Sequence, residues 1–364
     1  MGSRSYQDGF FVDRRKKKHV FSLVMLFFVM AIVIVLSVYN MIISSKVGIE
    51  KLSVTVNALP SRLEGTKILV LSDLHGASFG INQSELVKLF NGTDWDILCV
   101  VGDVTDERGS PRAFIRILEQ LEGGRPVIFI PGDEDPSPLN TDALSDGEVK
   151  SAYIRQIEQA GAVYLDVPYR YEVGGSVIWF CPEALYTLDL DAAERTAAAR
   201  RDELLEEEGS PQRDAYLRAA EYQLDRLERI REAQRMMQRT DIHVALSHVP
   251  LSENGLRDLH DRFYGSQSLY VQGISLVLSG HYNAGQWRVP WGGAFFIPSS
   301  FNLEESGFFV PDTGLKGAQS VVGVVQVITP GLNVSECYPG IMRYFRLFNR
   351  PSVTLVTMTR KITD

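Results

Sequence analysis

The stretch Ile68-Leu-Val-Leu-Ser-Asp-Leu-His-Gly76 decides the fold of this chain. Ile68 to Leu71 are four consecutive apolar residues, a pattern typical of a short buried strand. Ser72 to Gly76 then break the pattern, as expected where a strand runs into a loop. This loop carries a carboxylate, Asp73, and an imidazole, His75. Ligands of open α/β sheets bind beyond the carboxyl ends of the strands, so both side chains are candidate ligands.

The donor pair indicates which ions could bind there. Carboxylate oxygen combined with imidazole nitrogen suits Mn, Fe or Zn rather than Ca. A single Asp-x-His triplet is weak evidence, because such triplets are common. A metal site therefore needs further ligands from later strand ends.

Length, composition and charge indicate an ordinary globular chain. It has 364 residues, of which 45% are hydrophobic and 23% charged, enough for one large domain or two small ones. The net charge of −8 argues against nucleic-acid binding, as does the lack of a basic segment interleaved with aromatic residues. Cys99, Cys181 and Cys337 are too few and too scattered for a disulfide framework or a zinc knuckle.

An apolar segment near the N-terminus predicts a membrane anchor. Residues 20–43 contain few polar interruptions and are long enough to span a bilayer as a helix. This core is too long for a cleavable signal peptide. The cationic block Arg14-Arg-Lys-Lys-Lys18 precedes it. The positive-inside rule therefore predicts a cytoplasmic basic tail, residues 1–19, and an extracytoplasmic domain, residues 50–364.

The pattern of a buried strand followed by a polar loop recurs. Residues 95–101 and 126–131 are apolar apart from Asp96, and each run is followed by a loop that contains glycine and aspartate. Helical patterns separate the strands, which predicts a parallel sheet covered on both faces. Residues 169–173 and 177–180 predict a β-hairpin around Gly174-Gly175. We predict the later strands, at residues 242–246, 274–278, 294–297, 321–328 and 353–359, as the second half of a two-layered β structure.

Residues 188–240 have a different composition, rich in Ala, Glu and Arg, and predict a helical hairpin inserted in the domain. Gly209-Ser-Pro211 marks the break between its two helices. The hairpin has two interpretations. It is either a solvated helix pair that packs on the domain or a cap over a binding site.

Five strand ends offer candidate metal ligands in total. They are Asp73 with His75, Asp103, Asp133, His248, and His281 with Asn283. Two divalent ions about 3.5–4 Å apart need a shared carboxylate, and Asp103 is the natural bridge. Such a pair can bind a phosphoester oxygen on both ions and deprotonate a bridging water, so no Cys or Ser nucleophile is required.

These motifs resemble those of the calcineurin-like metallophosphoesterases. The matching segments are Asp73-Leu-His75, Gly102-Asp-Val-Thr-Asp106, Gly132-Asp-Glu-Asp135, His248 and Gly280-His-Tyr-Asn283. The resemblance runs from about residue 50 to the C-terminus, apart from the helical insertion. It implies a mixed α/β fold, a four-layer α/β/β/α sandwich. Leu63 to His75 and Gly285-Gln-Trp-Arg-Val-Pro290 look closest to the membrane-associated bacterial branch, which includes hydrolases of UDP-diacylglucosamine.

The resemblance also implies a ligand set for two divalent ions. One ion would be held by Asp73, His75 and Asp103, and the other by Asp103, Asp133, His248 and His281. Asn283 stands where the family has the remaining histidine of the first ion, and Asp106 would support the ligands from behind.

The sequence departs from the family pattern at three site positions. Asp133 replaces a neutral Asn ligand, and Asn283 replaces a His ligand with a weaker amide donor. Glu134 replaces the His that normally faces the phosphate. An ionised Glu134 would repel a phosphodiester, a protonated one could act as general acid, and the side chain could also ligate metal.

The expected function is that of a membrane-anchored dimetal phosphohydrolase, with Asp103 and Glu134 as catalytic residues and a metal-bound hydroxide as nucleophile. The anchor suggests a phosphodiester or pyrophosphate of a lipid or envelope glycan as substrate. The alternative is a catalytically silent relative that serves as a membrane-tethered binding module.

Overall fold

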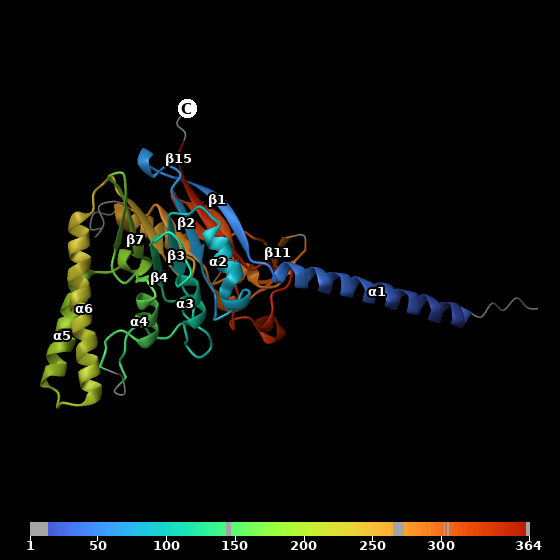
Figure 1. The fold of residues 1–364 in the computed structure, drawn as a ribbon, viewed down its shortest axis with the longest axis horizontal. Coiled ribbons are helices and arrows are strands. Elements are labelled where there is room, and N and C mark those ends of the chain that lie inside the picture. The colour runs from blue at the N-terminus through green and yellow to red at the C-terminus, as the bar shows by residue number, and fades with distance from the viewer. Residues whose placement is uncertain are drawn as a thin grey trace, which may run out of the picture.

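The computed structural model describes residues 14–142, 147–264, 273–290, 292–301, 303 and 306–361. Two six-stranded sheets lie face to face, and helices cover the outer side of each sheet (Figure 1). The predicted four-layer α/β architecture is therefore confirmed.

The first sheet contains the strand with which the sequence analysis began. Its order is β1 (Gly48–Val56), β15 (Ser352–Arg360), β2 (Lys67–Leu71), β3 (Ile97–Val101), β4 (Val127–Ile130) and β5 (Val163–Tyr164). β2 to β5 are parallel, as predicted. Side chains alternate across a strand, so Leu69 and Leu71 face the outer helices whereas Ile68 and Val70 face the second sheet. The outer helices are α2 (Ser84–Asn91), α3 (Arg112–Leu118) and α4 (Ala152–Gln159).

The second sheet has the order β13 (Gly317–Val321), β14 (Val324–Ile328), β9 (Leu276–Ser279), β8 (Ile242–Leu246), β7 (Ser176–Pro182) and β6 (Tyr169–Val173). The predicted hairpin at residues 169–180 is confirmed as β6 and β7. The prediction of one strand over residues 321–328 is wrong. The chain turns at Val322 and Gly323, whose φ angles of +47° and +87° break the extended conformation, and β13 pairs antiparallel with β14.

Two late strands lie outside the second sheet, contrary to the prediction. β15, which contains residues 353–359, inserts between β1 and β2 of the first sheet. β11 (Gly292–Ile297) pairs with β10 (Arg288–Val289) and β12 (Gly307–Val310) in a separate three-stranded sheet. Apolar periodicity identifies a strand but does not specify its partner, which explains both errors.

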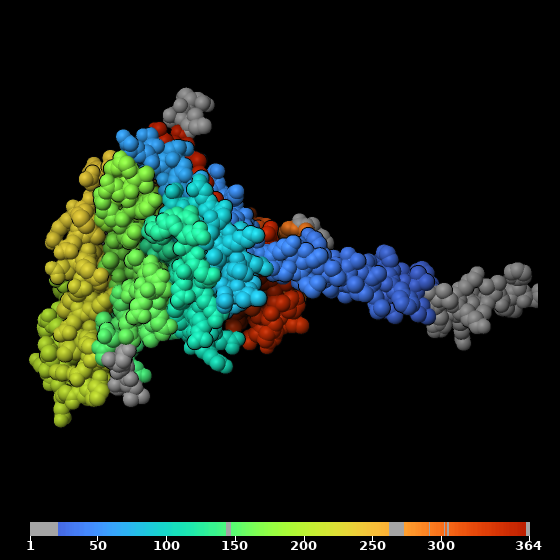
Figure 2. All heavy atoms as spheres, viewed as in Figure 1, coloured from blue at the N-terminus to red at the C-terminus, as the bar shows by residue number. Residues whose placement is uncertain are grey.

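The predicted helical hairpin consists of α5 (Leu190–Glu206) and α6 (Pro211–Met236). Asp189 Oδ1 caps α5 by accepting from Ala192 N at 2.9 Å, and Ser210 Oγ caps α6 by accepting from Arg213 N at 3.1 Å. Leu190, Leu227, Ile230 and Ala233 pack against the outer face of β7 at Val177, Trp179 and Cys181. The hairpin forms one outer wall of the molecule (Figure 2). A further helix, α7 (Glu253–Tyr264), precedes β9.

Helix α1 (Arg14–Ser44) projects away from the two sheets (Figure 1). Within the described ranges, its segment Phe21–Ser44 is the one helix long and apolar enough to cross a membrane. Its large apolar side chains are exposed. Residues 1–13 of the predicted basic tail lie outside the described residues.

Candidate metal centre

The predicted ligands converge at one edge of the two sheets. Asp73 and His75 follow β2, Asp103 follows β3, and Asp133 follows β4. From the second sheet, His248 follows β8 and His281 follows β9. Six of the seven predicted ligands form two groups of neighbouring donor atoms, and Asp103 belongs to both.

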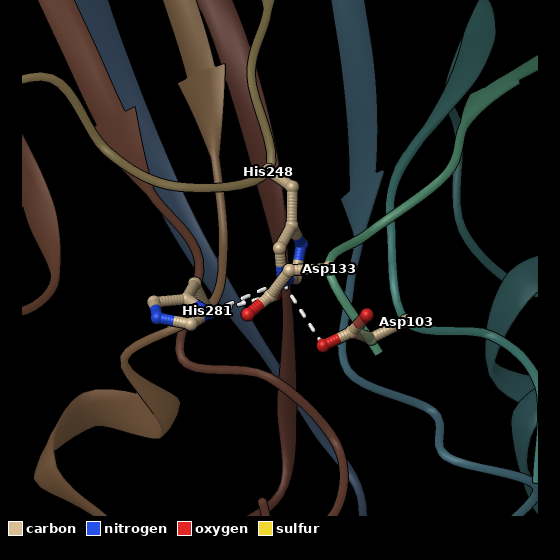
Figure 3. A group of neighbouring side chains, drawn as sticks. All are labelled: Asp103, Asp133, His248 and His281. Atoms are coloured by element: carbon tan, nitrogen blue, oxygen red, sulfur yellow. Dashed lines mark hydrogen bonds and ion pairs between the residues drawn. The ribbon is translucent and has the colours of Figure 1, made fainter. Parts of the chain in front are cut away.

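Asp103, Asp133, His248 and His281 form the first of these groups (Figure 3). His248 Nε2 lies 3.0 Å from Asp103 Oδ2 and 2.9 Å from Asp133 Oδ1. His281 Nδ1 lies 3.2 Å from the same Asp133 oxygen. Two carboxylates and two imidazoles therefore point at one small volume.

Asp73, His75 and Asp103 form the second group. His75 Nε2 lies 4.0 Å from Asp73 Oδ1 and 3.7 Å from Asp103 Oδ2. Asp73 Oδ1 and His75 Nε2 are buried and have no hydrogen-bond partner. A buried, unpartnered carboxylate oxygen is costly, and a cation between these atoms would remove that cost. The residues present therefore fit a divalent ion.

The donors are held by backbone conformations that most residues avoid. Asp73, His75, Asp103, His281 and Asn283 have φ angles of +54°, +41°, +54°, +69° and +49°. Left-handed conformations of non-glycine residues are strained and gather at functional sites. Five of the seven predicted ligands share this feature, so the loops are shaped around the donor atoms.

Close packing also fixes the loop of Asp103. A Cβ atom at Gly132 would lie 2.0 Å from Asp103 Oδ1. Only glycine therefore allows the loop after β4 to approach that carboxylate, which also accepts a hydrogen bond from Glu134 N at 3.0 Å. Asp135 ties the same two loops together, because its carboxylate accepts from the N–H groups of Val104, Thr105 and Gly132.

Electrostatics at the site favour a positive charge among the donors. Hydrogen bonds from His248 and His281 lower the pKa of Asp133 far below its usual range. Burial lowers the pKa of His248, but its hydrogen bonds with Asp103 and Asp133 outweigh burial and hold that pKa well above its usual value. The carboxylates thus stabilise a proton on His248. A divalent ion would supply the same charge and displace that proton.

The tautomer of His248 suits a ligand. Its Nδ1 lies 2.7 Å from the carbonyl oxygen of Val101. A carbonyl can only accept, so Nδ1 carries the hydrogen and donates. Nε2 is thereby directed toward Asp103 and Asp133, the usual arrangement of a histidine ligand with an outer hydrogen-bond partner.

Glu134 lies beside the group that contains His75. Its Oε2 is 3.4 Å from His75 Nδ1, and its Oε1 accepts from Ser335 Oγ at 2.8 Å. The Cys337 thiol also contacts Oε1, at 3.5 Å. Glu134 therefore faces the site from its edge, with one oxygen anchored by a loop far away in the sequence.

Asn283 lies in the same region but is held by an arginine. Its Oδ1 accepts from Arg346 Nη1 at 3.1 Å, and its carbonyl oxygen accepts from Arg346 Nη2 at 3.3 Å. The amide nitrogen of Asn283 is buried without a hydrogen-bond partner. Arg346 therefore occupies one acceptor position of the side-chain oxygen that the sequence suggested as a ligand.

A cavity of about 690 Å³ adjoins Asp133 and His281. Its walls include apolar side chains, namely Val249, Leu251, Phe301, Leu303 and Val310. No described residue of α5 or α6 lines it. The helical hairpin thus packs on the second sheet, as the first interpretation expected, and the described part of the hairpin does not cover this cavity.

Sequence reasoning missed three residues that shape the site. Asp135 stands in the same loop as Asp133, so the run Gly132-Asp-Glu-Asp135 was a usable signal. Ser335 and Arg346 lie in late loops that carry no recognisable motif. Asp106, which the resemblance places behind the ligands, accepts from Arg108 N and Ser110 N in its own turn.

Comparison with known proteins adds one family match and several similar structures. The family model described as calcineurin-like phosphoesterase matches residues 66–283, a range that contains all seven predicted ligands. Phosphopantetheinyl hydrolase (PptH) from Mycobacterium tuberculosis is 17% identical, with a TM-score of 0.35 over 73% of this chain and 89% of that chain. The protein TT1561 of Thermus thermophilus is 14% identical, with a TM-score of 0.34 over 73% and 90%. A search of curated proteins gave no match.

Proposed function

The chain belongs to the calcineurin-like phosphoesterase family, and from this premise we propose that it is a phosphoester hydrolase that uses two divalent metal ions. One observation carries the proposal. The Asp103 carboxylate belongs to both donor groups, with Oδ2 at 3.0 Å from His248 Nε2 and 3.7 Å from His75 Nε2. A shared carboxylate at this position is what a two-ion site requires.

In this proposal Asp73, His75 and Asp103 hold one ion, and Asp103, Asp133, His248 and His281 hold the other. Mn, Fe or Zn suits this mixture of carboxylates and imidazoles. Two such ions supply Lewis acidity that polarises the phosphoryl group and makes water a strong nucleophile near neutral pH. Asn283 is a weaker contributor, because Arg346 already uses one acceptor position of its oxygen.

The proposed role of Glu134 is to deliver a proton to the leaving oxygen. Ser335 Oγ and Cys337 Sγ contact Oε1, which leaves Oε2 directed toward His75. The side chain is 28% exposed, so a substrate could reach it. A general acid must lie within hydrogen-bond reach of the departing group, and the edge of the site offers that position.

We further propose that α1 anchors the chain in a membrane, with the sheets on the extracytoplasmic side. The 24 residues of Phe21–Ser44 span about 36 Å as a helix, enough for a hydrocarbon core of about 30 Å. The cationic residues 14–18 precede the span and favour a cytoplasmic N-terminus. The anchor and the apolar side chains in the wall of the cavity beside Asp133 both favour a phosphodiester or pyrophosphate of a lipid or envelope glycan as substrate, a class that includes UDP-diacylglucosamine.

One observation favours a second candidate, a metallophosphoesterase-like binding module without turnover. Arg346 is buried and directs its guanidinium at Asn283, the position where the family pattern has a histidine ligand. A fixed cation there weakens the binding of the ion at Asp73 and His75. A site that lost that ion would retain the donors at Asp133, His248 and His281 but lose catalysis.

Hydrolysis of an aryl phosphodiester by the full chain in detergent, with Mn²⁺ or Zn²⁺, tests the proposal. We expect metal-dependent turnover that falls at least ~100-fold in Asp103→Asn but not in Asp94→Asn. Asp94 is a matched control, because it pairs with Lys67 on the surface. A chain that binds metal ions but hydrolyses the substrate with neither Mn²⁺ nor Zn²⁺ would favour the binding module. A chain that binds no ion would contradict both candidates.

A further inference from the structure

A cluster of aromatic and aliphatic side chains lies exposed on the sheet of β10, β11 and β12 and on the neighbouring segment 340–345. We define the aromatic face as Phe308, Phe309, Ile341, Tyr344 and Phe345. The first four are between 63% and 73% exposed, and Phe345 is 38% exposed. Contiguous exposed apolar patches on a protein surface mark interaction sites.

Ring contacts connect three members of the face, Phe308, Phe309 and Phe345. Phe295 lies beneath it, with ring centroids 5.6 Å from Phe308 and 5.5 Å from Phe309. Trp287 links this pair to the other segment, at 6.3 Å from Phe295 and 5.0 Å from Phe345. The indole N–H of Trp287 also donates to the carbonyl oxygen of Phe345 at 2.9 Å. Phe295 and Trp287 thus link Phe308 and Phe309 to Phe345, and Ile341 and Tyr344 lie in the short segment just before Phe345.

The backbone of β12 departs from the regular strand to expose two rings at once. Successive side chains of a strand point to opposite faces, yet both Phe308 and Phe309 are exposed. Phe309 has a φ angle of +60°, a strained conformation for an aromatic residue. The strand therefore presents both rings outward at a conformational cost.

The aromatic face continues directly into the residues that hold the end of α1. Asn40 of α1 donates to the carbonyl oxygen of Arg346 at 3.2 Å and accepts from Phe348 N at 2.6 Å. The rings of Tyr39 and Phe348 lie 6.2 Å apart. Figure 1 shows α1 leaving the domain beside β11, and Figure 2 shows late residues, in orange and red, beside the base of the helix.

Basic side chains accompany the face. Arg343 lies between Ile341 and Tyr344 and is exposed. Lys46 and Arg350, at the end of α1, are exposed as well, and Arg350 Nε donates to the carbonyl oxygen of Lys46 at 2.9 Å. Aromatic rings together with Lys and Arg are the residues that proteins place at the boundary between lipid and water.

From these observations we propose that the aromatic face docks on the lipid bilayer in which α1 is anchored, and holds the domain of the two sheets against the membrane surface. The inference rests on the proposed membrane span but not on the proposed hydrolysis. Val310, which follows Phe309 in the chain, lines the cavity beside Asp133 and His281. Strand β12 thus borders both the docked surface and the cavity, which places the proposed active site close to lipid-derived substrates.

Environment-sensitive fluorophores on single cysteines test the inference in the full chain. The background variant is Cys337→Ser, because Cys337 is exposed whereas Cys99 and Cys181 are buried. Probes replace Phe308 and Tyr344 on the face, Val33 in α1, and Glu208 at the tip of the helical hairpin as the matched control. Each protein is reconstituted in lipid nanodiscs at one copy per disc, with brominated lipids as quencher.

We expect blue-shifted emission and quenching at positions 33, 308 and 344, and water-like emission at 208. Water-like emission at 308 and 344 together with a quenched probe at 33 would overturn the docking while leaving the span intact. Water-like emission at 33 as well would overturn the span and the docking together. Blue-shifted emission at 308 and 344 that appears only with two copies per disc would show that the aromatic face contacts a second copy of the chain. That result would also overturn the inference.

Discussion

Arg346 Nη1 donates to Asn283 Oδ1 at 3.1 Å, so that a buried guanidinium stands directly behind the candidate metal centre. All the described hydrogen bonds of this guanidinium go to neutral acceptors. Four are backbone carbonyl oxygens, those of Asn283, Pro330, Asn333 and Asn349, and two are the side-chain amide oxygens of Asn283 and Asn349. Burial lowers the pKa of Arg346 to about 10, while the charge of Asp73 acts against this shift. The side chain therefore stays charged at neutral pH and joins four loop positions by hydrogen bonds.

Replacing this arginine should destabilise the domain. Arg346→Ala would leave several buried oxygens without a donor, and we expect a loss of about 3 kcal/mol in the free energy of unfolding. Chemical denaturation of the full chain in detergent measures this loss in the free energy of unfolding. Arg343→Ala is the matched control, because Arg343 lies in the same segment but is exposed. Equal stability of the two variants would refute the structural role of Arg346.

The two donor groups predict a specific pattern of metal loss. The native chain should bind two Mn²⁺ ions, His281→Ala should retain one tightly bound ion, and Asp103→Asn should weaken the binding of both ions by ~100-fold or more. The reason is that Asp103 alone belongs to both groups. Equilibrium dialysis followed by elemental analysis counts the ions. Retention of two tightly bound ions by Asp103→Asn would show that the Asp103 carboxylate is not shared between the two ions.

Asp135 should matter although we do not propose it as a ligand. Both of its oxygens accept backbone N–H bonds, so Asp135→Asn turns one acceptor into a donor that faces other donors. We expect a loss of about 1–3 kcal/mol of stability and ~10–100-fold weaker metal binding. Asp106→Asn is the control, because Asp106 accepts both of its bonds through Oδ1, which asparagine retains. Similar effects of the two variants would contradict this reading of Asp135.

His243 should make stability depend on pH. Burial lowers its pKa to about 4, against a smaller opposing effect of Asp241, whereas an exposed imidazole titrates near ~6.5. The unfolded chain therefore binds the proton first. The contribution of neutral His243 to the free energy of unfolding is therefore complete above pH ~6.5. It is lost as the pH falls toward 4, and the loss is on the order of 3 kcal/mol.

The test of this prediction compares the native chain with His243→Asn, which keeps a hydrogen-bonding group near the Tyr186 hydroxyl. Denaturation is followed at several pH values by tryptophan fluorescence, to which Trp179, whose indole donates to Asp241 beside β8, contributes. The variant should lose less stability between pH 6.5 and 4 than the native chain does. Parallel pH curves would assign the acid sensitivity to other groups.

Much of the candidate site was visible in the sequence because its signals are local. Apolar runs such as Ile68–Leu71 specify buried strands, and in a parallel sheet the loops after such strands meet at one edge. Asp73, Asp103 and His248 could therefore be grouped from the sequence. The partners of Glu134 and Asn283 could not. Ser335 and Arg346 reach them from loops 201 and 63 residues away in the sequence.

The sequence by itself indicated the buried strands β2, β3, β4, β8 and β9, the apolar helix near the N-terminus, the helical hairpin and the candidate metal ligands, since each depends on periodicity or spacing within a short segment. Only the tertiary structure decided that β15 inserts between β1 and β2 and that β11 lies in a separate sheet. It also joined Arg346 to Asn283 and brought the aromatic face beside α1. These features arise from pairing and packing between distant segments, and the local pattern of a strand or loop does not specify which partner it will meet.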